Sequence, residues 1–415
     1  MVLDFEIALA TVIEHASLLR ITRTTFENET VPLLESVGRV LAESILADRD
    51  QPPFDRSTRD GFAINSADLS LGVPLNIVGQ VRAGDIWTGA PIAPGEAVEI
   101  MTGTPVPAGV DAVIMVEHVS VTGTTVKAAD GRKLRPGENI VLRGSEARHG
   151  NTVVAPGSLL GAAEIAEAAT CGKSLLQVFA RPRIAIVATG DELVEIHERP
   201  AVCQIRNSNS YGLAAMVAAT GGTPIRFETA RDTRQDIRDR IAEGRTSSLL
   251  LFSGGVSMGK FDLVEEVLVE CNAEFFFTGV MMQPGKPLVF GRLPGLDGPE
   301  GLSGCYFFGL PGNPISTQVT FHCFVEPLLR VLCGQDVAAP RFVQATLAED
   351  IAGKSGLMRV LPAHLTYDLR TPSVKLIAWH GSGDLAANAR ANCYAVLPPE
   401  RPQFHAGDVI SVLLR

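Results

Sequence analysis

The sequence contains no run of about 18 apolar residues, no Cys-x-x-Cys pair and no basic segment at its start. The missing apolar run argues against a membrane-spanning helix. Residues 1–19 carry Asp4, Glu6 and Glu14 and are typical of an amphipathic helix, so we expect no export signal and a cytoplasmic protein. The 7 cysteines are scattered, so we expect reduced thiols and neither a zinc site nor a disulfide framework.

An excess of positive charge is also missing. The chain has 36 Lys and Arg against 46 Asp and Glu, which gives a net charge of −10. This balance disfavours nucleic acid or an anionic membrane as the main partner, although a local basic pocket for a small anion stays compatible with it. With 415 residues, 46% of them apolar, the chain is long enough for about two to four domains.

Strand and helix patterns alternate from about residue 183 to residue 334. This alternation predicts βαβ units, and therefore a doubly wound, mainly parallel sheet with helices on both faces. Before it, helical patterns at 4–20 and about 31–47 precede a Pro-rich segment and a series of short strands. We predict a helical N-terminal/linker domain at 1–50 and 144–180, an inserted β domain at 51–143, an α/β domain at 181–336, and a C-terminal β-barrel at 337–415.

Four loops of the α/β region are rich in glycine, carboxylates and hydroxyls. They are TGDE (189–192), ARD (230–232), SGGVSMGKFD (253–262) and GLPGNPIS (309–316). In open parallel sheets, ligands bind beyond the carboxyl ends of the strands, where these loops are expected to converge. The sequence therefore predicts a binding site at this edge.

The loop SGGVSMGKFD follows an apolar strand and precedes a helical pattern. A glycine turn of this kind places bare backbone N–H groups and a helix N-terminus at one point, where a phosphate or another oxyanion is held. Gly254 to Lys260 also fits the opening of a P-loop, but Phe261 stands where a P-loop requires Ser or Thr. We therefore expect an anion site and regard a nucleotide hydrolase as a disfavoured alternative.

Several blocks taken together, among them PPFDRSTRDGFAI (52–64), IAIVATGDELV (184–194), LFSGGVSMGKFDLV (251–264) and GLPGNPIS (309–316), resemble the molybdopterin molybdenumtransferase family, which includes the E domain of gephyrin. The resemblance implies an elongated homodimer and an α/β module similar to the molybdopterin-adenylyltransferase fold. It implies insertion of molybdate into adenylylated molybdopterin with release of AMP, the final step of molybdenum cofactor biosynthesis. A molybdopterin adenylyltransferase is a possible partner.

The resemblance also assigns four catalytic carboxylates, Asp60, Glu192, Asp232 and Asp262, the last three as ligands of Mg²⁺. A phosphoanhydride substrate suits a divalent metal held by carboxylates. From pattern alone, Asp60 is equally an Asp-Gly turn between strands, Glu192 a solvated acid that caps the next element, and Asp232 the N-cap of the next helix.

The remaining expected contacts are with the substrates, and we regard Lys286 as the cation for phosphate or molybdate. Thr102 is also an ordinary turn residue before Pro105, and Asn313 is expected to order its own turn first. The expected substrate-binding residues are Thr102, Ser253, Gly254, Gly255, Ser257, Lys286, Pro311, Gly312, Asn313, Arg359 and Ser382.

Two positions depart from the family pattern. Gln283 stands where many members have a lysine, and Glu146 stands where an Asp is common. These changes concern the affinity for the oxyanion more than the reaction class. A binding or scaffold protein that keeps the fold without catalysis is the alternative from a different functional class.

Overall fold

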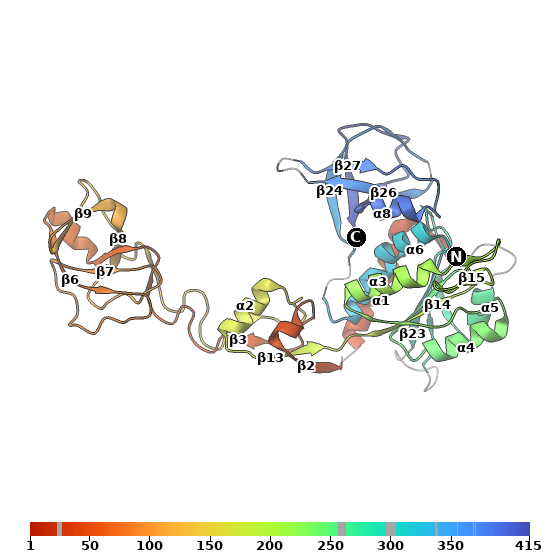
Figure 1. Cartoon of the computed structure of the whole chain (residues 1–415), viewed down its shortest axis with the longest axis horizontal. Coiled ribbons are helices and arrows are strands. Elements are labelled where there is room, and N and C mark those ends of the chain that lie inside the picture. The colour runs from red at the N-terminus through yellow and green to blue at the C-terminus, as the bar shows by residue number, and fades with distance from the viewer. Residues whose placement is uncertain are drawn as a thin grey trace.

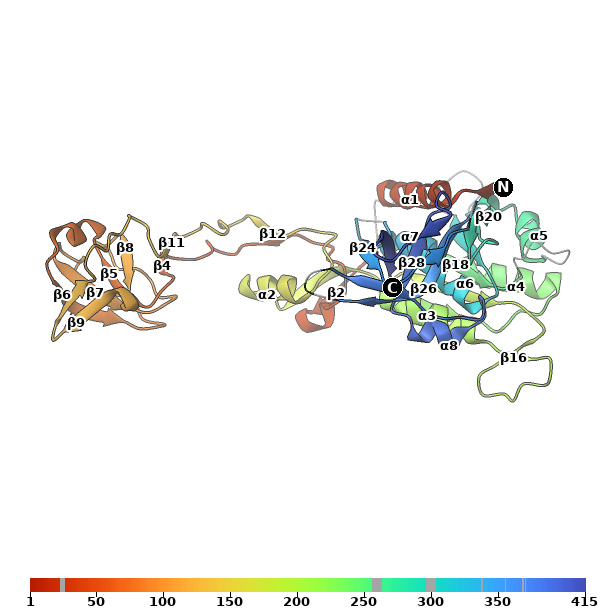
Figure 2. The same cartoon turned by 90° about the horizontal axis from the view of Figure 1, so that it is seen from above.

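The computed structural model describes residues 1–22, 27–255, 263–295, 304–336, 339–354, 356–367, 369 and 371–415. The molecule is elongated (Figure 1). A small β domain lies at one end, and the α/β domain with the C-terminal barrel lies at the other, in both views (Figure 2). Across these residues, no helix has both the length and the apolar composition that a bilayer crossing requires.

The β domain at the far end is a six-stranded sheet in the order β8-β5-β7-β6-β10-β9. Its core is formed by alternate residues such as Phe62, Ile64 and Ile114. The chain enters and leaves it through the antiparallel pair of β4 and β11. The strands are β4 (Arg56–Ser57), β5 (Gly61–Ile64), β6 (Leu75–Val81), β7 (Glu96–Ile100), β8 (Ala112–Met115), β9 (Val119–Thr122), β10 (Thr125–Ala128) and β11 (Ile140–Val141).

Between the ends lies a linker region of paired short strands and one helix. It contains β2 (Asn28–Pro32), the 3-10 helix η1 (Leu33–Ser36), β3 (Ile45–Leu46), β12 (Thr152–Val154), α2 (Ala162–Thr170) and β13 (Leu175–Phe179). The helix predicted at about 31–47 is wrong. Its first residues pair with β13 along β2, and Gly38 has a φ of 74°, which a continuing helix excludes. The apolar residues that suggested a helix instead fill a small core around Leu41 and Ile45.

The α/β domain confirms the predicted doubly wound sheet, in the order β17-β14-β18-β23-β22-β19. The first four strands are parallel, and β22 and β19 are antiparallel additions. Alternate residues of β14 point to opposite faces, Ile184 into one core and Ala185 into the other. The strands are β14 (Arg183–Ala188), β17 (Thr223–Arg226), β18 (Leu249–Ser253), β19 (Glu274–Phe277), β22 (Val289–Leu293) and β23 (Cys305–Leu310).

Helices cover both faces of this sheet. One face carries α1 (Phe5–Thr22), α3 (Ser208–Thr220), α6 (Pro314–Thr320) and α7 (Glu326–Leu332), the last two joined by a π-helical turn, η4 (Phe321–Val325). The other face carries α4 (Arg234–Gly244) and α5 (Leu263–Glu270). The buried side of α1, including Phe5 and Val12, belongs to the same core as α7. The first helix of the chain therefore packs on the α/β domain.

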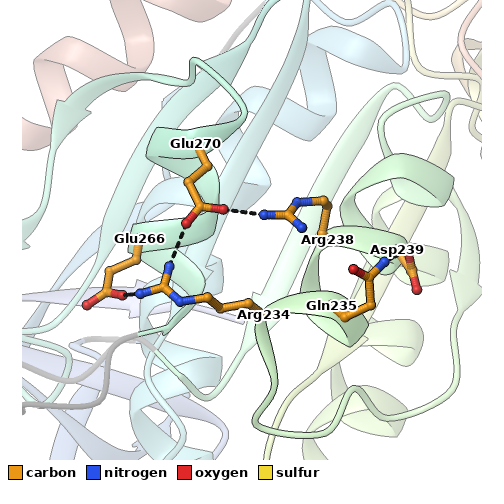
Figure 3. A network of polar contacts seen from close by, with 6 residues as sticks. All are labelled: Arg234, Gln235, Arg238, Asp239, Glu266 and Glu270. Atoms are coloured by element: carbon orange, nitrogen blue, oxygen red, sulfur yellow. Dashed lines mark hydrogen bonds and ion pairs between the residues drawn. The ribbon is translucent and has the colours of Figure 1, made fainter.

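An ion-pair network ties α4 to α5 (Figure 3). Arg234 binds both Glu266 and Glu270, and Arg238 binds Glu270. The side chains are about half exposed, so each pair is expected to contribute less than about 1 kcal/mol to stability. Because α4 follows Asp232 and α5 follows Asp262, the network fixes the helices that come after two of the predicted site loops.

The C-terminal domain is a closed barrel, because β26 pairs with both β27 and β28 while β24 and β30 complete the ring. The short strand β21 of the preceding domain pairs with the start of β26. The short helix α8 (Leu385–Arg390) was not predicted. The strands are β21 (Met282–Gln283), β24 (Phe342–Leu347), β26 (Met358–Thr366), β27 (Ser373–Leu376), β28 (Cys393–Leu397) and β30 (Val409–Leu414).

Candidate functional site

The loops predicted to converge meet between β14 and β18. The strand order 2-1-3 within the first three strands makes this the topological switch point of the sheet, where such folds bind ligands. The amide of Thr189, directly after β14, donates to the carbonyl of Ser253 at 3.1 Å. The amide of Gly254 donates to the carbonyl of Leu310 at 3.2 Å. Three loops from distant parts of the sequence are therefore held edge to edge.

Gly254 and Gly255 leave the backbone bare at this point. Their φ angles are 93° and 65°, and a Cβ on either residue would lie 2.7 Å from an oxygen of Thr189. No larger residue fits both the space and the conformation. Ser257 and Asp262, together with Lys260 and Phe261 of the P-loop comparison, lie outside the described residues.

Thr189 itself was not predicted as a site residue. It is 3% exposed, and its Oγ1 has no hydrogen-bond partner within the described part of the chain. A buried hydroxyl without a partner is unfavourable, so this group is available to a ligand at the glycine turn. Its position as the first residue after an apolar strand, in TGDE, was the available signal.

Asn209 was also missed, although it joins two of the predicted loops. Its Nδ2 donates to Ser253 Oγ at 2.9 Å and to the carbonyl of Gly312 at 2.7 Å. Asn207 caps α3 through a hydrogen bond from the Ser210 amide. The repeated asparagine at this helix start was the signal, because one side chain caps the helix and the other is free to face the site.

The predicted carboxylates of the next loops lie at the same edge. Glu192 folds back over its own turn, since a Cβ on Gly190 would lie 2.4 Å from Glu192 Oε2. The amide of Asp232 donates to Asp191 Oδ1 at 3.3 Å, which brings the second acidic loop beside the first. The N-cap alternative for Asp232 is wrong, because Thr233 occupies that position and accepts from Asp236.

The described residues contain no group of three or more metal-ligating side chains close enough to hold an ion. Glu192 and Asp232 nevertheless supply exposed oxygen donors of the type that Mg²⁺ prefers, and Asp262, the third predicted ligand, is outside the described residues. The donor chemistry therefore fits magnesium.

Lys286 and Ser382 border this edge. Because β22 runs antiparallel to β23, with Val289 opposite Gly309, Lys286 lies just before β22 at the carboxyl ends of the parallel strands, and it is exposed. The amide of Ile315 donates to the carbonyl of Ser382 at 2.9 Å, so a barrel loop reaches the loop that contains Pro311, Gly312 and Asn313.

Arg359 lies where the barrel joins the α/β domain. It is opposite Gln283 in the β21–β26 pair, its Nη1 donates to the Ala352 carbonyl at 2.6 Å, and burial lowers the pKa of its guanidinium. Lys354 Nζ lies 3.4 Å from Gln283 Oε1. The charge of Lys354 therefore lies beside Gln283, the position at which many family members have a lysine.

Asp60 and Thr102 are brought together with each other but not with the switch point. Asp60 Oδ1 accepts from the Thr102 amide at 2.7 Å and from its hydroxyl at 2.9 Å. These hydrogen bonds, the backbone one first, hold the pKa of the Asp60 carboxyl below its usual value. Both residues belong to the β domain at the opposite end of the molecule (Figures 1 and 2).

Family models match three segments that together include most of the chain. Residues 3–172 match the MoeA N-terminal region (domain I and II), residues 185–331 match a probable molybdopterin binding domain, and residues 344–414 match the MoeA C-terminal region (domain IV).

Individual relatives agree with these matches. The molybdopterin molybdenumtransferase of Staphylococcus aureus (strain COL) is 32% identical over 395 residues, covering 93% of this chain and 90% of that protein. The enzyme of the same name from Synechocystis is 33% identical over 389 residues, covering 92% and 94%. A crystal structure of the molybdopterin biosynthesis MoeA protein from Pyrococcus horikoshii OT3 is 26% identical, covers 100% of both chains and has a TM-score of 0.78. The chain therefore belongs to the MoeA family of molybdopterin biosynthesis proteins.

Proposed function

We propose that this protein is a molybdopterin molybdenumtransferase, which inserts molybdate into adenylylated molybdopterin and releases AMP. The proposal rests on the glycine turn at the switch point, which faces the Thr189 hydroxyl, a group with no hydrogen-bond partner among the described residues. Backbone N–H groups and a hydroxyl are the donors that a phosphoanhydride requires. The identity of more than 30% with enzymes of this name over most of the chain supports the reaction class.

In this proposal the two substrates occupy adjacent parts of one edge. The phosphoanhydride lies on Gly254 and Gly255, and Asn209 keeps the Ser253 and Gly312 loops in place around it. Molybdate, a dianion, lies toward Lys286, Arg359 and Ser382. Glu192, Asp232 and Asp262 would hold Mg²⁺, which when bound supplies charge neutralisation of the phosphate oxygens.

A homodimer is the second part of the proposal. Asp60 and Thr102 belong to the β domain, which lies at the opposite end of the molecule from the switch point of the same subunit (Figure 2). If they take part in the reaction, the β domain of a second subunit must supply them. Differently tagged Asp60→Ala and Glu192→Ala chains, coexpressed and isolated as a heterodimer, contain one intact site. We expect about half of the wild-type activity, whereas each homodimer is nearly inactive. Sites built within one subunit would leave the heterodimer as inactive as the homodimers.

Two further expectations belong to the proposal. A molybdopterin adenylyltransferase supplies the substrate, since the reaction begins from an adenylylated pterin. A cytoplasmic location is supported by the scattered cysteines of the sequence, which contain no Cys-x-x-Cys pair.

The reaction is tested by incubating the protein with adenylylated molybdopterin, magnesium and molybdate and measuring AMP. The proposal predicts AMP release that depends on molybdate, and no hydrolysis of ATP supplied without the pterin. Substrate binding without AMP release would support a scaffold protein instead. ATP hydrolysis in the absence of pterin would support a nucleotide hydrolase.

A further inference from the structure

A second cleft lies beside the switch point, at the carboxyl end of β17. Its volume is about 420 Å³, and its lining includes Leu193, Glu195, Glu198, Arg226, Phe227 and Thr229. These residues come from the segment after β14 and from the end of β17 with the residues that follow it, which are neighbouring strands of the parallel sheet. Clefts of this size hold small ligands, and a fused two-ring heterocycle fits in one.

Glu195 and Arg226 line this cleft and are joined to each other through Tyr211. The Tyr211 hydroxyl donates to Glu195 Oε2 at 3.2 Å, and Arg226 Nη2 donates to the Tyr211 hydroxyl at 3.0 Å. The Arg226 guanidinium also lies over the Tyr211 ring, 3.6 Å from its centroid. Glu195 and Arg226 are 32% and 29% exposed, so the carboxylate is oriented by partners while one side stays open to a ligand.

The cleft is joined to the glycine turn by hydrogen bonds. Thr229, in its lining, accepts from Asn207 Nδ2 at 3.2 Å. Asn207 begins α3, the same helix from which Asn209 reaches Ser253. Next to Thr229, the carbonyl of Ala230 accepts from the Gly190 amide at 3.2 Å. The cleft and the glycine turn are therefore held together at the same edge of the sheet.

The charge of the cleft indicates which part of the substrate it binds: the phosphate, the pterin ring or the adenine ring. Glu195, Glu198 and Glu228 line it together with the cation Arg226, and the net negative charge of this lining disfavours a phosphate. A pterin carries a ring N–H next to an exocyclic amino group, two parallel donors that match one carboxylate. Adenine presents an amino donor beside a ring acceptor and matches a carboxylate with only one bond. Phe227 adds an apolar surface for a flat ring.

We propose that this cleft binds the pterin ring of the substrate, with the Glu195 carboxylate accepting from the 2-amino group and the adjacent ring N–H, and with Tyr211 as a positioning residue. The assignment rests on the proposed function, because it takes the pterin from that substrate. The phosphoanhydride then lies on the glycine turn, away from the three carboxylates.

The test measures binding of two probes to the full-length protein: pterin, and lumazine, which has an oxygen in place of the 2-amino group. The wild-type protein is expected to bind pterin at least about 10-fold more tightly than lumazine. Glu195→Gln should weaken pterin binding by about 10- to 100-fold and change lumazine binding by less than about twofold. Tyr211→Phe, which keeps the ring under Arg226, should produce a smaller loss of the same selectivity.

Glu243→Gln is the control, because it removes the same charge from a half-exposed side chain of the same domain that pairs with Arg240 and is not among the residues that line the cleft. It should leave pterin binding within about twofold of wild type. Equal binding of the two probes by the wild type, or unchanged pterin binding in Glu195→Gln, overturns the assignment. The assignment is also overturned if AMP displaces pterin and if Glu195→Gln no longer binds AMP. Those two results would assign the cleft to the nucleotide.

These measurements are independent of turnover. If the wild-type protein binds pterin through Glu195 but releases no AMP from the full substrate, the cleft assignment stands and the proposed reaction fails. If molybdate-dependent AMP release occurs with an unchanged KM in Glu195→Gln, the reaction stands and the cleft assignment fails.

Discussion

Asp60 and Thr102, 42 residues apart in the sequence, share one oxygen, because Asp60 Oδ1 accepts from both the amide and the hydroxyl of Thr102. Two residues that were predicted separately as site residues are therefore joined by hydrogen bonds. The carboxylate is kept ionised and in a fixed orientation, which suits a group presented to the site of a second subunit.

Removing the hydroxyl alone should therefore change the acid. In Thr102→Val the amide hydrogen bond remains and the hydroxyl bond is lost, so the pKa of Asp60 should rise toward its usual value. NMR titration of the Asp60 carboxyl carbon measures the shift. Thr125→Val, in the same domain and bonded to the Thr122 carbonyl, is the control and should leave the Asp60 pKa unchanged. An equal Asp60 pKa in wild type and Thr102→Val contradicts the shared-oxygen account.

Glu192 and Asp191 are adjacent exposed acids with different expected roles. Glu192→Gln should lower AMP release by about 10²-fold, the order expected when a charged group is removed from a preorganised site. Asp191→Asn keeps the acceptor that the Asp232 amide uses and should retain most activity. Steady-state AMP release is the measurement, with melting temperature as the check on folding. If Glu192→Gln instead retains as much AMP release as Asp191→Asn, with both close to wild type, Glu192 is removed from the mechanism.

Lys354 offers a charge near the position of Gln283. Lys354→Ala should raise the molybdate concentration needed for half-maximal AMP release by about fivefold, the effect of one solvent-exposed charge at close range. Lys375→Ala is the control, since this barrel lysine pairs with Glu349. High salt should reduce the difference between wild type and Lys354→Ala. A salt-independent difference would indicate a structural role for the lysine.

Glu326 makes stability depend on pH. Burial raises the pKa of its carboxyl, but the hydrogen bond from His322 and the charges of His322, Arg330 and Arg341 outweigh burial, so the net shift is downward. A lowered pKa stabilises the fold above the unfolded-state value of about 4.3, and this contribution is lost as pH falls through the folded value.

Glu326→Gln should therefore cost about 3 kcal/mol at neutral pH, because it leaves the largely buried Arg330 guanidinium uncompensated. The gap between wild type and variant should narrow below about pH 4. Urea denaturation at several pH values measures this gap. Glu270→Gln, in the exposed network of Figure 3, should cost less than about 1 kcal/mol. A pH-independent gap for Glu326→Gln would show that its charge is not the cause.

The spacing of apolar residues predicted the helices and strands whose buried residues recur at a regular interval within the element itself. In α5, Leu263–Glu270, buried Val264, Val267 and Leu268 recur at helical spacing, which is why a helical pattern was recognised after the glycine loop. The doubly wound sheet was predictable for the same reason, since its central strands β14, β18 and β23 are short apolar runs. At 31–47 the first residues instead pair with β13, Val31 opposite Leu176 and Pro32 opposite Leu175, which are distant in the sequence. A local pattern contains no information about such a partner.

The residues of the candidate site also fall into those that could be predicted from the sequence and those that could not. Gly254 and Gly255 were predictable, because only glycine combines a positive φ with the close approach of Thr189. Asn209 was not, because its partners Ser253 and Gly312 lie 44 and 103 residues away and meet it only when the sheet is assembled. The distance from Asp60 to the switch point of its own chain likewise depends on the elongated arrangement in Figure 1.

We expect molybdate-dependent AMP release to take place at the loops that Asn209 holds together. The most direct measurement is AMP release from adenylylated molybdopterin as a function of molybdate, in wild type and in Asn209→Ala, with exposed Asn76→Ala of the far β domain as control. We expect AMP release to saturate with molybdate in wild type and in the control, and to fall about 10²-fold in Asn209→Ala at an unchanged melting temperature. Release that is independent of molybdate, or equal rates in all three proteins, would contradict this expectation.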